Sequence, residues 1–217
     1  NITSDDPITG LSGTVLLDDG SLLTFSEIEN IICFTPGTMI TTPLGQRPVE
    51  DLRPGDLVLT RDNGLQPVRW AGQRTVPGRG KLAPIRLRKG LITGQQADLL
   101  VSPQHRFLMQ GYKIEMYTGS TEALVAARHL TSTDLAFREE RDEVTYVHIL
   151  FDQHEVILAE GAPTESFHPG QQGLDGIENA AREELFMIFP ELRSSANSYG
   201  KAARRSLKAF EAALILG

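Results

Sequence analysis

Residues 33–40 read CFTPGTMI and residues 99–107 read LLVSPQHRF. The first stretch begins with Cys33, the single cysteine of the sequence, and the second places Ser102 and His105 in a Ser-x-x-His pattern. A thiol can attack the carbonyl carbon of the peptide bond before it, and an imidazole can protonate the amide nitrogen that leaves. The two stretches together therefore predict self-cleavage of the bond between Ile32 and Cys33.

A plainer interpretation of Cys33 is that it belongs to the hydrophobic core. Free cysteine is among the most frequently buried residue types and usually behaves as a small hydrophobe. Its neighbours Ile31, Ile32 and Phe34 are all apolar and fit this interpretation equally well. The cysteine alone does not decide between the two, so the second motif and the rest of the chain carry the argument.

The composition is that of an ordinary globular chain. The 217 residues contain 40% hydrophobic and 23% charged residues, enough for one large domain or two small ones. The formal net charge of −7 argues against a nucleic-acid-binding surface. The short basic clusters at residues 86–89 and 201–205 are typical of solvated faces.

The single cysteine excludes an internal disulfide framework and leaves the redox compartment open. No stretch approaches the ~20 apolar residues that span a bilayer, so we expect no membrane span. Residues 1–6 read NITSDD, with no basic segment or apolar run, and no signal peptide is visible. Because Asn1 is not a natural start, we expect the chain to be a piece of something longer.

Short strands separated by Gly and Pro predict an all-β body between residues 33 and 169. The expected strands cover residues 38–41, 56–60, 66–70, 84–88, 97–101, 105–109, 144–150 and 154–159. Upstream, an Asp-Asp-Gly turn at 18–20 predicts a hairpin over residues 13–25. Residues 75–81 are expected to form a loop.

The end of the chain predicts two helices, over residues 175–189 and 201–216, from apolar residues at helical spacing. In the second, Ala203, Leu207, Phe210 and Leu214 share one stripe. We expect this stripe to pack on the β body, which is the commoner use of such a face; contact with a membrane surface is the alternative.

Three motifs in order resemble the Hint module shared by hedgehog autoprocessing domains and inteins. They are CFTPGT at 33–38, RPVEDLRPGDLVL at 47–59 and SPQH at 102–105; QPVRW at 66–70 and DQHEVI at 152–157 resemble bacterial Hint proteins most. The resemblance spans residues 33–169 and implies an all-β, pseudo-twofold horseshoe. It divides the chain into an upstream segment (1–32), a Hint domain (33–169) and a helical extension (170–217). It also suggests a secreted or cell-surface bacterial protein.

The resemblance implies a mechanism as well. Cys33 would attack the carbonyl carbon of Ile32 and form a thioester, while His105 would act as the general acid on the leaving nitrogen. Ser102 stands where the family usually has Thr, and its hydroxyl would hold the scissile amide. The substrate is then the chain's own upstream polypeptide, and water, a thiol or an amine is the second nucleophile. No cofactor is implied.

A later strand-like stretch adds His148, at a place where inteins carry an aspartate that assists the cysteine. His148 is either catalytic or orienting, or it is a strand histidine satisfied by backbone. Thr35 and His154 are candidates for an orienting role, although His154 also fits structural hydrogen bonding. His129 and His168 are expected to be structural.

A metal site built from Cys33, His105, His148 and His154 matches no standard zinc spacing, and we expect none. Splicing inteins end in His-Asn, and the asparagine cyclises to release the downstream segment. Here Glu165 and Ser166 occupy those places, and serine cannot form a succinimide. The departures predict that downstream cleavage and splicing are disabled.

Ile32 is β-branched beside the scissile carbonyl and is expected to slow attack by an outside nucleophile. An alternative hypothesis therefore stands beside autoprocessing. In it the Hint fold is slow or inactive, and it serves as a structural or interaction cap of a larger secreted protein.

Overall fold

The N-terminal residues form a small antiparallel sheet of their own. The computed structural model describes residues 2–6, 10–16, 22–25, 32–169, 182, 186–189, 192 and 199–216. The first three strands are β1 (Ile2–Asp6), β2 (Gly10–Leu16) and β3 (Leu22–Phe25). Leu16 of β2 pairs with Leu22 of β3, which confirms the hairpin expected over residues 13–25. The turn at 18–20 lies outside the described residues.

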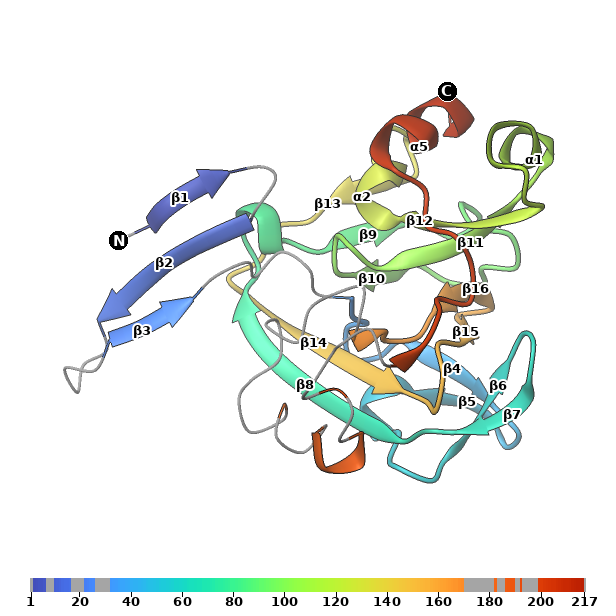
Figure 1. The fold of residues 1–217 in the computed structure, drawn as a ribbon, viewed down its shortest axis with the longest axis horizontal. Coiled ribbons are helices and arrows are strands. Elements are labelled where there is room, and N and C mark those ends of the chain that lie inside the picture. The colour runs from blue at the N-terminus through green and yellow to red at the C-terminus, as the bar shows by residue number, and fades with distance from the viewer. Residues whose placement is uncertain are drawn as a thin grey trace.

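The largest sheet in the described part of the chain has eight antiparallel strands (Figure 1). Its main path runs β12–β11–β16–β15–β4–β5, and β15 also pairs with β6, which pairs with β7. The strands are β4 (Met39–Thr42), β5 (Gly45–Pro48), β6 (Leu57–Thr60), β7 (Gly64–Pro67), β11 (Arg106–Gln110), β12 (Glu122–Ala126), β15 (Val156–Ala159) and β16 (Ala162–Glu165).

A long two-stranded ribbon lies beside this sheet. It consists of β8 (Trp70–Pro77) and β14 (Glu143–Leu150), which pair along their whole length (Figure 1). Gly72 lies opposite His148, and Arg74 lies opposite Tyr146. Because side chains two residues apart share a face of a strand, these four positions lie on one face of the ribbon.

A third small sheet completes the body and positions the Ser-x-x-His motif. It contains β9 (Ile85–Leu87), β10 (Leu99–Val101) and β13 (Ala136–Arg138) in the order β10–β9–β13. Ser102 follows directly after β10, and His105 directly precedes β11. The connection between the two strands therefore carries both residues.

The predominantly β architecture confirms the fold class expected from the sequence, and all eight expected strands have counterparts. Two details were wrong. The expected strand at 66–70 contains the break between β7 and β8, because Val68 N–H bonds the carbonyl of Asp56 outside the ladder. The expected loop at 75–81 begins three residues too early, since Thr75 and Val76 still pair with β14.

The β body also carries four short helical elements. They are α1 (Tyr112–Thr118), α2 (Ala127–Leu130) and the 3-10 turns η1 (Val49–Asp51) and η2 (Gly80–Leu82).

The C-terminal helix is shorter than predicted. Helix α5 covers only Ala209–Leu216, whereas residues 201–208 are not helical. There, Leu124 N–H donates to the carbonyl of Arg205, and Leu207 N–H donates to the carbonyl of Leu124. β12 lies at the edge of its sheet, so its outer N–H and C=O groups are free to pair with residues 205–207. This pairing holds the segment in an extended form and prevents a helix there. Most of the helix expected at 175–189 lies outside the described residues; residues 186–188 are helical.

The buried face of α5 also differs from the predicted stripe. Ala212 and Ile215 join the core together with Leu207, while Phe210 and Leu214 are 62% and 52% exposed. Of the predicted stripe, Leu207 is buried and Ala203 packs against a second buried cluster, whereas Phe210 and Leu214 do not contribute to the core. Within the described residues no helix is long and apolar enough to cross a membrane.

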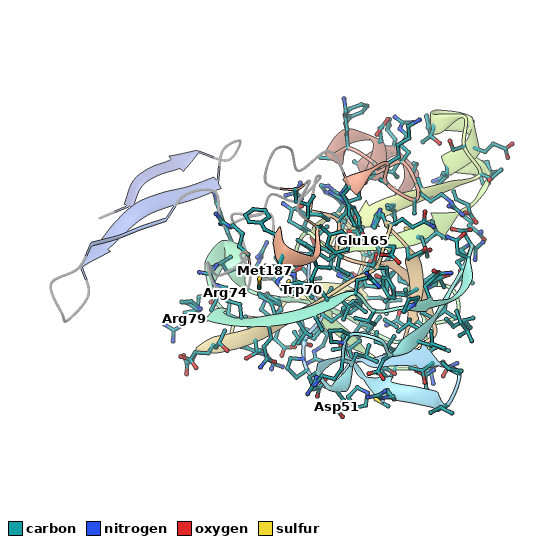
Figure 2. All side chains as sticks on the ribbon, turned by 60° about the horizontal axis from the view of Figure 1, so that its bottom comes forward. Asp51, Trp70, Arg74, Arg79, Glu165 and Met187 are labelled. Atoms are coloured by element: carbon teal, nitrogen blue, oxygen red, sulfur yellow. The ribbon has the colours of Figure 1, made fainter. Side chains whose placement is uncertain are left out.

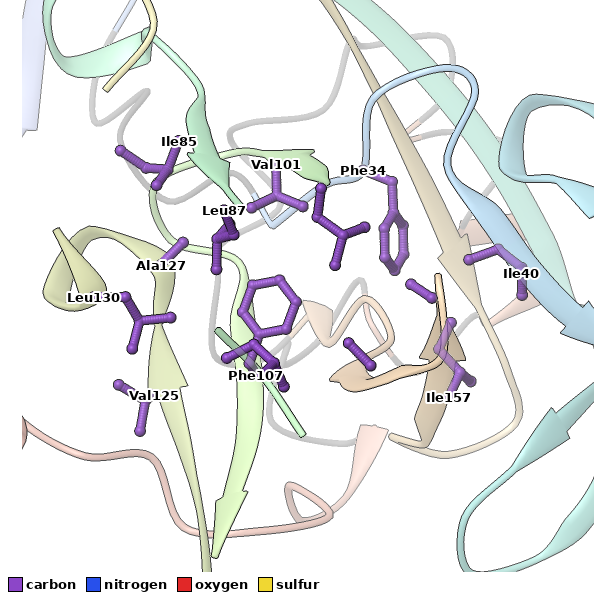
Figure 3. Packing of buried hydrophobic residues seen from close by; sticks show 14 of the residues in the cluster. Phe34, Ile40, Ile85, Leu87, Val101, Phe107, Val125, Ala127, Leu130 and Ile157 are labelled. Carbon is purple, nitrogen blue, oxygen red and sulfur yellow. The ribbon is translucent and has the colours of Figure 1, made fainter. Parts of the chain in front are cut away.

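The main core links the segment that follows Ile32 to the rest of the body. One buried hydrophobic cluster contains Phe34, Val101 and Phe107 together with Ile85, Leu87 and Ile157 (Figure 3). Phe34 N–H donates to the carbonyl of Val147 at 3.0 Å, and Val147 N–H donates back at 2.8 Å. Phe34 also bridges to Val101. Burial and backbone pairing therefore fix the chain immediately after Cys33.

Candidate active site

Cys33 lies between β10 and β14, and Ser102 holds its backbone on both sides. Cys33 N–H donates to Ser102 Oγ at 3.0 Å, and Ser102 N–H donates to the Cys33 carbonyl at 3.1 Å. Both residues are fully buried. The amide nitrogen of the candidate scissile bond is thus held by the hydroxyl that the sequence singled out.

His148 projects from β14 to the thiol. Both of its ring nitrogens, Nδ1 and Nε2, lie 3.2 Å from Cys33 Sγ. The ring also hydrogen-bonds the backbone of Ile32, on the other side of the candidate scissile bond. A neutral imidazole has one donor and one acceptor nitrogen, so it can donate to a carbonyl and accept from a thiol at the same time. His148 can therefore serve both reacting groups.

The surroundings keep both the thiol and the imidazole uncharged. Cys33 packs against Val76, Val144 and Tyr146, and this burial raises the pKa of the thiol well above its usual value, against the opposing charge of Arg74. Burial lowers the pKa of His148 to about 4, against the opposing hydrogen bond to Ile32. Near pH 7 the resting pair is therefore thiol and neutral imidazole.

Aromatic rings hold His148 beside the sulfur. The ring of Phe167 lies edge-on at 5.1 Å between centroids, and the indole of Trp70 lies at 6.1 Å. Trp70 and Arg74 both come from β8 (Figure 2). Gly72, between them, is covered by the indole, because a Cβ there would lie 2.3 Å from Trp70 Cζ2. The missing side chain of Gly72 therefore lets Trp70 lie over the strand next to His148.

His105 lies in the turn after Ser102, to whose carbonyl its N–H donates at 3.1 Å. Its ring packs edge-on against Phe34 at 4.5 Å and Phe107 at 5.2 Å. Nε2 contacts Thr164 Oγ1, and Nδ1 is buried with no hydrogen-bond partner within the described structure. Burial lowers the pKa of His105 to about 3, helped by the charge of Arg106. His105 is therefore neutral at physiological pH.

Comparison with known protein families shows which family the chain belongs to. Residues 32–171 match the family model described as the Hint domain, which covers more than half of the chain. The chain belongs to the Hint family. Hint domains, which include inteins, process their own polypeptide chain. Comparison with the sequences of curated proteins finds no match.

Solved structures with a Hint fold resemble this chain at low identity. The solution structure of the bacterial intein-like domain from Clostridium thermocellum is 15% identical, with a TM-score of 0.42, over 63% of this chain and 99% of that one. A DnaB intein from Synechocystis sp. is 11% identical, with a TM-score of 0.40, over 63% and 99%. The gp41-1 intein is 11% identical, with a TM-score of 0.38, over 62% and 98%.

Thr35 anchors the Hint segment after the cysteine. Its hydroxyl donates to the carbonyl of Leu100 at 2.7 Å, and its own carbonyl accepts from Thr38 Oγ1 at 2.8 Å. Thr35 thereby ties the loop after Phe34 to β10, the strand that leads to Ser102. This contact acts on the backbone around the site and not on the thiol.

His154 belongs to a different cluster of the Hint domain. Its Nε2 lies 3.1 Å from the carbonyl of Ser166, and its Nδ1 accepts from the N–H of Ala203 at 3.0 Å. Glu165 is fully buried beside it and also lies 3.3 Å from Arg106. His154 therefore joins the last Hint strand to the C-terminal extension.

The four residues considered for a metal do not form a ligand set. Cys33 and His148 are in contact, while His154 is engaged by Ser166 and Ala203. Within the described ranges, no group of three or more His, Cys, Asp or Glu residues could hold a metal ion.

Sequence reasoning missed the residues that orient the two histidines. Thr164 lies 59 residues after His105 in the chain and is brought to it by the pairing of β11 with β16. Phe167 and Trp70 reach His148 from two other segments. The alternation of apolar and polar residues in the strands that carry Thr164 and Trp70 indicates which side chains face inward. It does not indicate which side chains from different strands come into contact.

The buried histidines predict acid sensitivity of the fold. Burial lowers the pKa of His148 from the ordinary 6.5 to about 4. Between pH 6.5 and 4, His148 is therefore protonated in the unfolded chain and neutral in the folded chain. The free energy of unfolding is therefore highest above pH 6.5 and decreases as the pH falls toward 4. His148 accounts for about 3 kcal/mol of this decrease. Urea unfolding at pH 7.5 and 4.5 measures the loss. His148→Gln should reduce the difference between the two pH values, and equal reduction by His129→Gln would contradict the assignment.

Proposed function

We propose that this Hint domain cleaves its own chain at the Ile32–Cys33 bond through a thioester. The observation that carries the proposal is the contact of Cys33 Sγ with His148 at 3.2 Å, on a ring that also hydrogen-bonds the backbone of Ile32. A nucleophile, a base and the carbonyl to be attacked meet there in one buried place. The hydrogen bond from Cys33 N–H to Ser102 adds the leaving group to the same site.

In the first step, His148 takes the proton from Cys33 Sγ as the sulfur attacks the carbonyl carbon of Ile32. The raised pKa of the buried thiol makes a base necessary, and the lowered pKa of His148 keeps its nitrogen free of a proton at pH 7. A carbon–sulfur bond forms, and negative charge develops on the Ile32 oxygen. The positive charge of Arg74, which already lowers the pKa of the thiol, favours that charge as well.

In the second step, the bond between the Ile32 carbon and the Cys33 nitrogen breaks. The nitrogen leaves as an amine and therefore needs a proton. The proton that His148 took from the thiol passes to Nδ1 of His105, which gives it to the nitrogen. Ser102 holds the nitrogen during this change. Both histidines end neutral and one proton has moved from the Cys33 sulfur to its nitrogen, so the products are a thioester and a free α-amino group at Cys33.

A second nucleophile resolves the thioester. Water gives an Ile32 carboxylate and returns the Cys33 thiol, and an outside thiol or amine gives the corresponding thioester or amide. Release of the downstream segment is disabled in this proposal. Glu165 is paired with Arg106, and Ser166 Oγ accepts the N–H of Glu155 at 3.0 Å.

The test is cleavage by a strong nucleophile. The purified 217-residue chain is incubated with hydroxylamine at pH 8 and followed by intact mass spectrometry. Cleavage should release residues 1–32 as the hydroxamate of Ile32 and leave residues 33–217 with a free thiol. Cys33→Ala, with matching circular dichroism, should release none. Release from both proteins at the same rate, or from neither while both stay folded, would overturn the proposal.

A second candidate function follows from burial. Cys33 and Ile32 are only 0% and 2% exposed, which keeps an outside nucleophile away from the bond between them. In this second function the Hint fold serves as a structural cap, and the thiol is idle. A folded wild type that stays intact for days in hydroxylamine, with Cys33→Ala changed only in stability, would support the cap.

A further inference from the structure

One buried contact at the site has no part in the two steps of cleavage. His105 precedes β11, and Thr164 belongs to β16, whose pairing with β11 sets Thr164 opposite Phe107. His105 Nε2 contacts Thr164 Oγ1, and both side chains are fully buried. The contact therefore joins the candidate general acid to a hydroxyl with no access to water.

The direction of this hydrogen bond follows from the second partner of the hydroxyl. Thr164 Oγ1 lies 2.9 Å from the carbonyl oxygen of Arg106, which can only accept. The hydroxyl has one proton and gives it to that carbonyl. It can then only accept from His105, so Nε2 must carry the imidazole proton.

The other ring nitrogen is left as a lone pair. With the proton on Nε2, a neutral His105 has an unprotonated Nδ1, and this atom has no hydrogen-bond partner in the described structure. The rings of Phe34 and Phe107 both pack edge-on against the imidazole and limit its rotation. A buried acceptor without a partner is costly, and such groups are commonly found where chemistry uses them.

We infer that Thr164 is a positioning residue that fixes His105 as the Nε2–H tautomer and so keeps Nδ1 as the atom that exchanges a proton with the scissile amide. The inference rests on the proposed function. During cleavage Nδ1 takes up the proton that left the Cys33 thiol and gives it to the Cys33 nitrogen as the carbon–nitrogen bond breaks, while Nε2 keeps its proton throughout. His105 ends neutral, in the tautomer in which it started.

Nitrogen NMR tests the tautomer without needing cleavage. The ¹⁵N shifts of the His105 ring are measured at pH 7 on the full chain carrying Cys33→Ala, which keeps the bond intact, and are assigned with a His105→Gln spectrum. We expect a protonated Nε2 and an unprotonated Nδ1. In Thr164→Val the Nε2 proton loses its acceptor, so the two tautomers should mix; in Thr164→Ser the original shifts should return. A protonated Nδ1 with Thr164 present, or no change in Thr164→Val, would overturn the inference.

Cleavage by hydroxylamine then tests the consequence with Cys33 in place. Thr164→Val should cleave about ten times more slowly, and Thr164→Ser should recover most of the rate. Thr42→Val is the matched control, because the buried Thr42 hydroxyl also donates to a carbonyl and accepts an N–H, but its partners are Gly45 and Leu44 and not a histidine. An equal loss of rate in Thr42→Val would contradict the positioning role. A wild type that does not cleave refutes the proposed function, while the NMR result still decides the tautomer.

Discussion

His148→Ala should slow hydroxylamine cleavage of the Ile32–Cys33 bond by a factor of about 100 or more, the usual contribution of a general base. The thiol is buried with a raised pKa, and His148 is the group 3.2 Å from its sulfur. Without the imidazole the proton has no acceptor as the sulfur attacks. The measurement is the rate of release of residues 1–32 by intact mass spectrometry, at a hydroxylamine concentration where the rate no longer rises.

Two further variants make this result specific. His148→Asp restores the carboxylate that inteins carry in this strand and should recover part of the rate, since a base again faces the sulfur. His129→Ala removes a histidine from α2, outside the site, and should cleave like the wild type. If His148→Ala cleaves at the wild-type rate, the contact with Cys33 is structural and another group takes the thiol proton.

Gly72→Ala should have the second large effect, on stability and on cleavage together. The new Cβ would lie 2.3 Å from Trp70 Cζ2 and 2.4 Å from Cη2, so the indole has to move. Overpacking of this kind costs about 1–3 kcal/mol. The displaced indole borders His148, so we expect cleavage to slow by roughly tenfold as the imidazole loses its position. Urea unfolding and the hydroxylamine assay measure the two effects.

The double variant Gly72→Ala/Trp70→Phe identifies the cause. Phenylalanine lacks the indole atoms that the new methyl group meets, so adding Gly72→Ala to Trp70→Phe should cost much less than adding it to the wild type. No positive φ angle is required at Gly72, so backbone strain does not contribute. Equal costs in the two backgrounds would show that the methyl group clashes elsewhere.

Local patterns in the sequence predict much of the fold correctly. The Asp-Asp-Gly turn indicates the hairpin, because few residues other than Gly fit such turns. The strand that leads into the Ser-x-x-His turn, β10, lies within the strand expected at 97–101. The length of the C-terminal helix was overestimated. Residues 201–208 have apolar residues at helical spacing, but residues 205 and 207 hydrogen-bond to Leu124 at the edge of β12 instead. Helical spacing describes one segment, and the competing sheet edge belongs to another.

The sequence by itself determined the chemical groups: the single thiol of Cys33, the Ser-x-x-His pattern of Ser102 and His105, and His148 in a strand-like stretch. Tertiary structure alone decided their geometry and protonation. His148 meets Cys33 across 115 residues of chain, and Thr164 meets His105 across 59. Packing sets these distances, and the removal of water on burial lowers the pKa of both histidines. Desolvation depends on every segment that covers the site, so no local pattern encodes it.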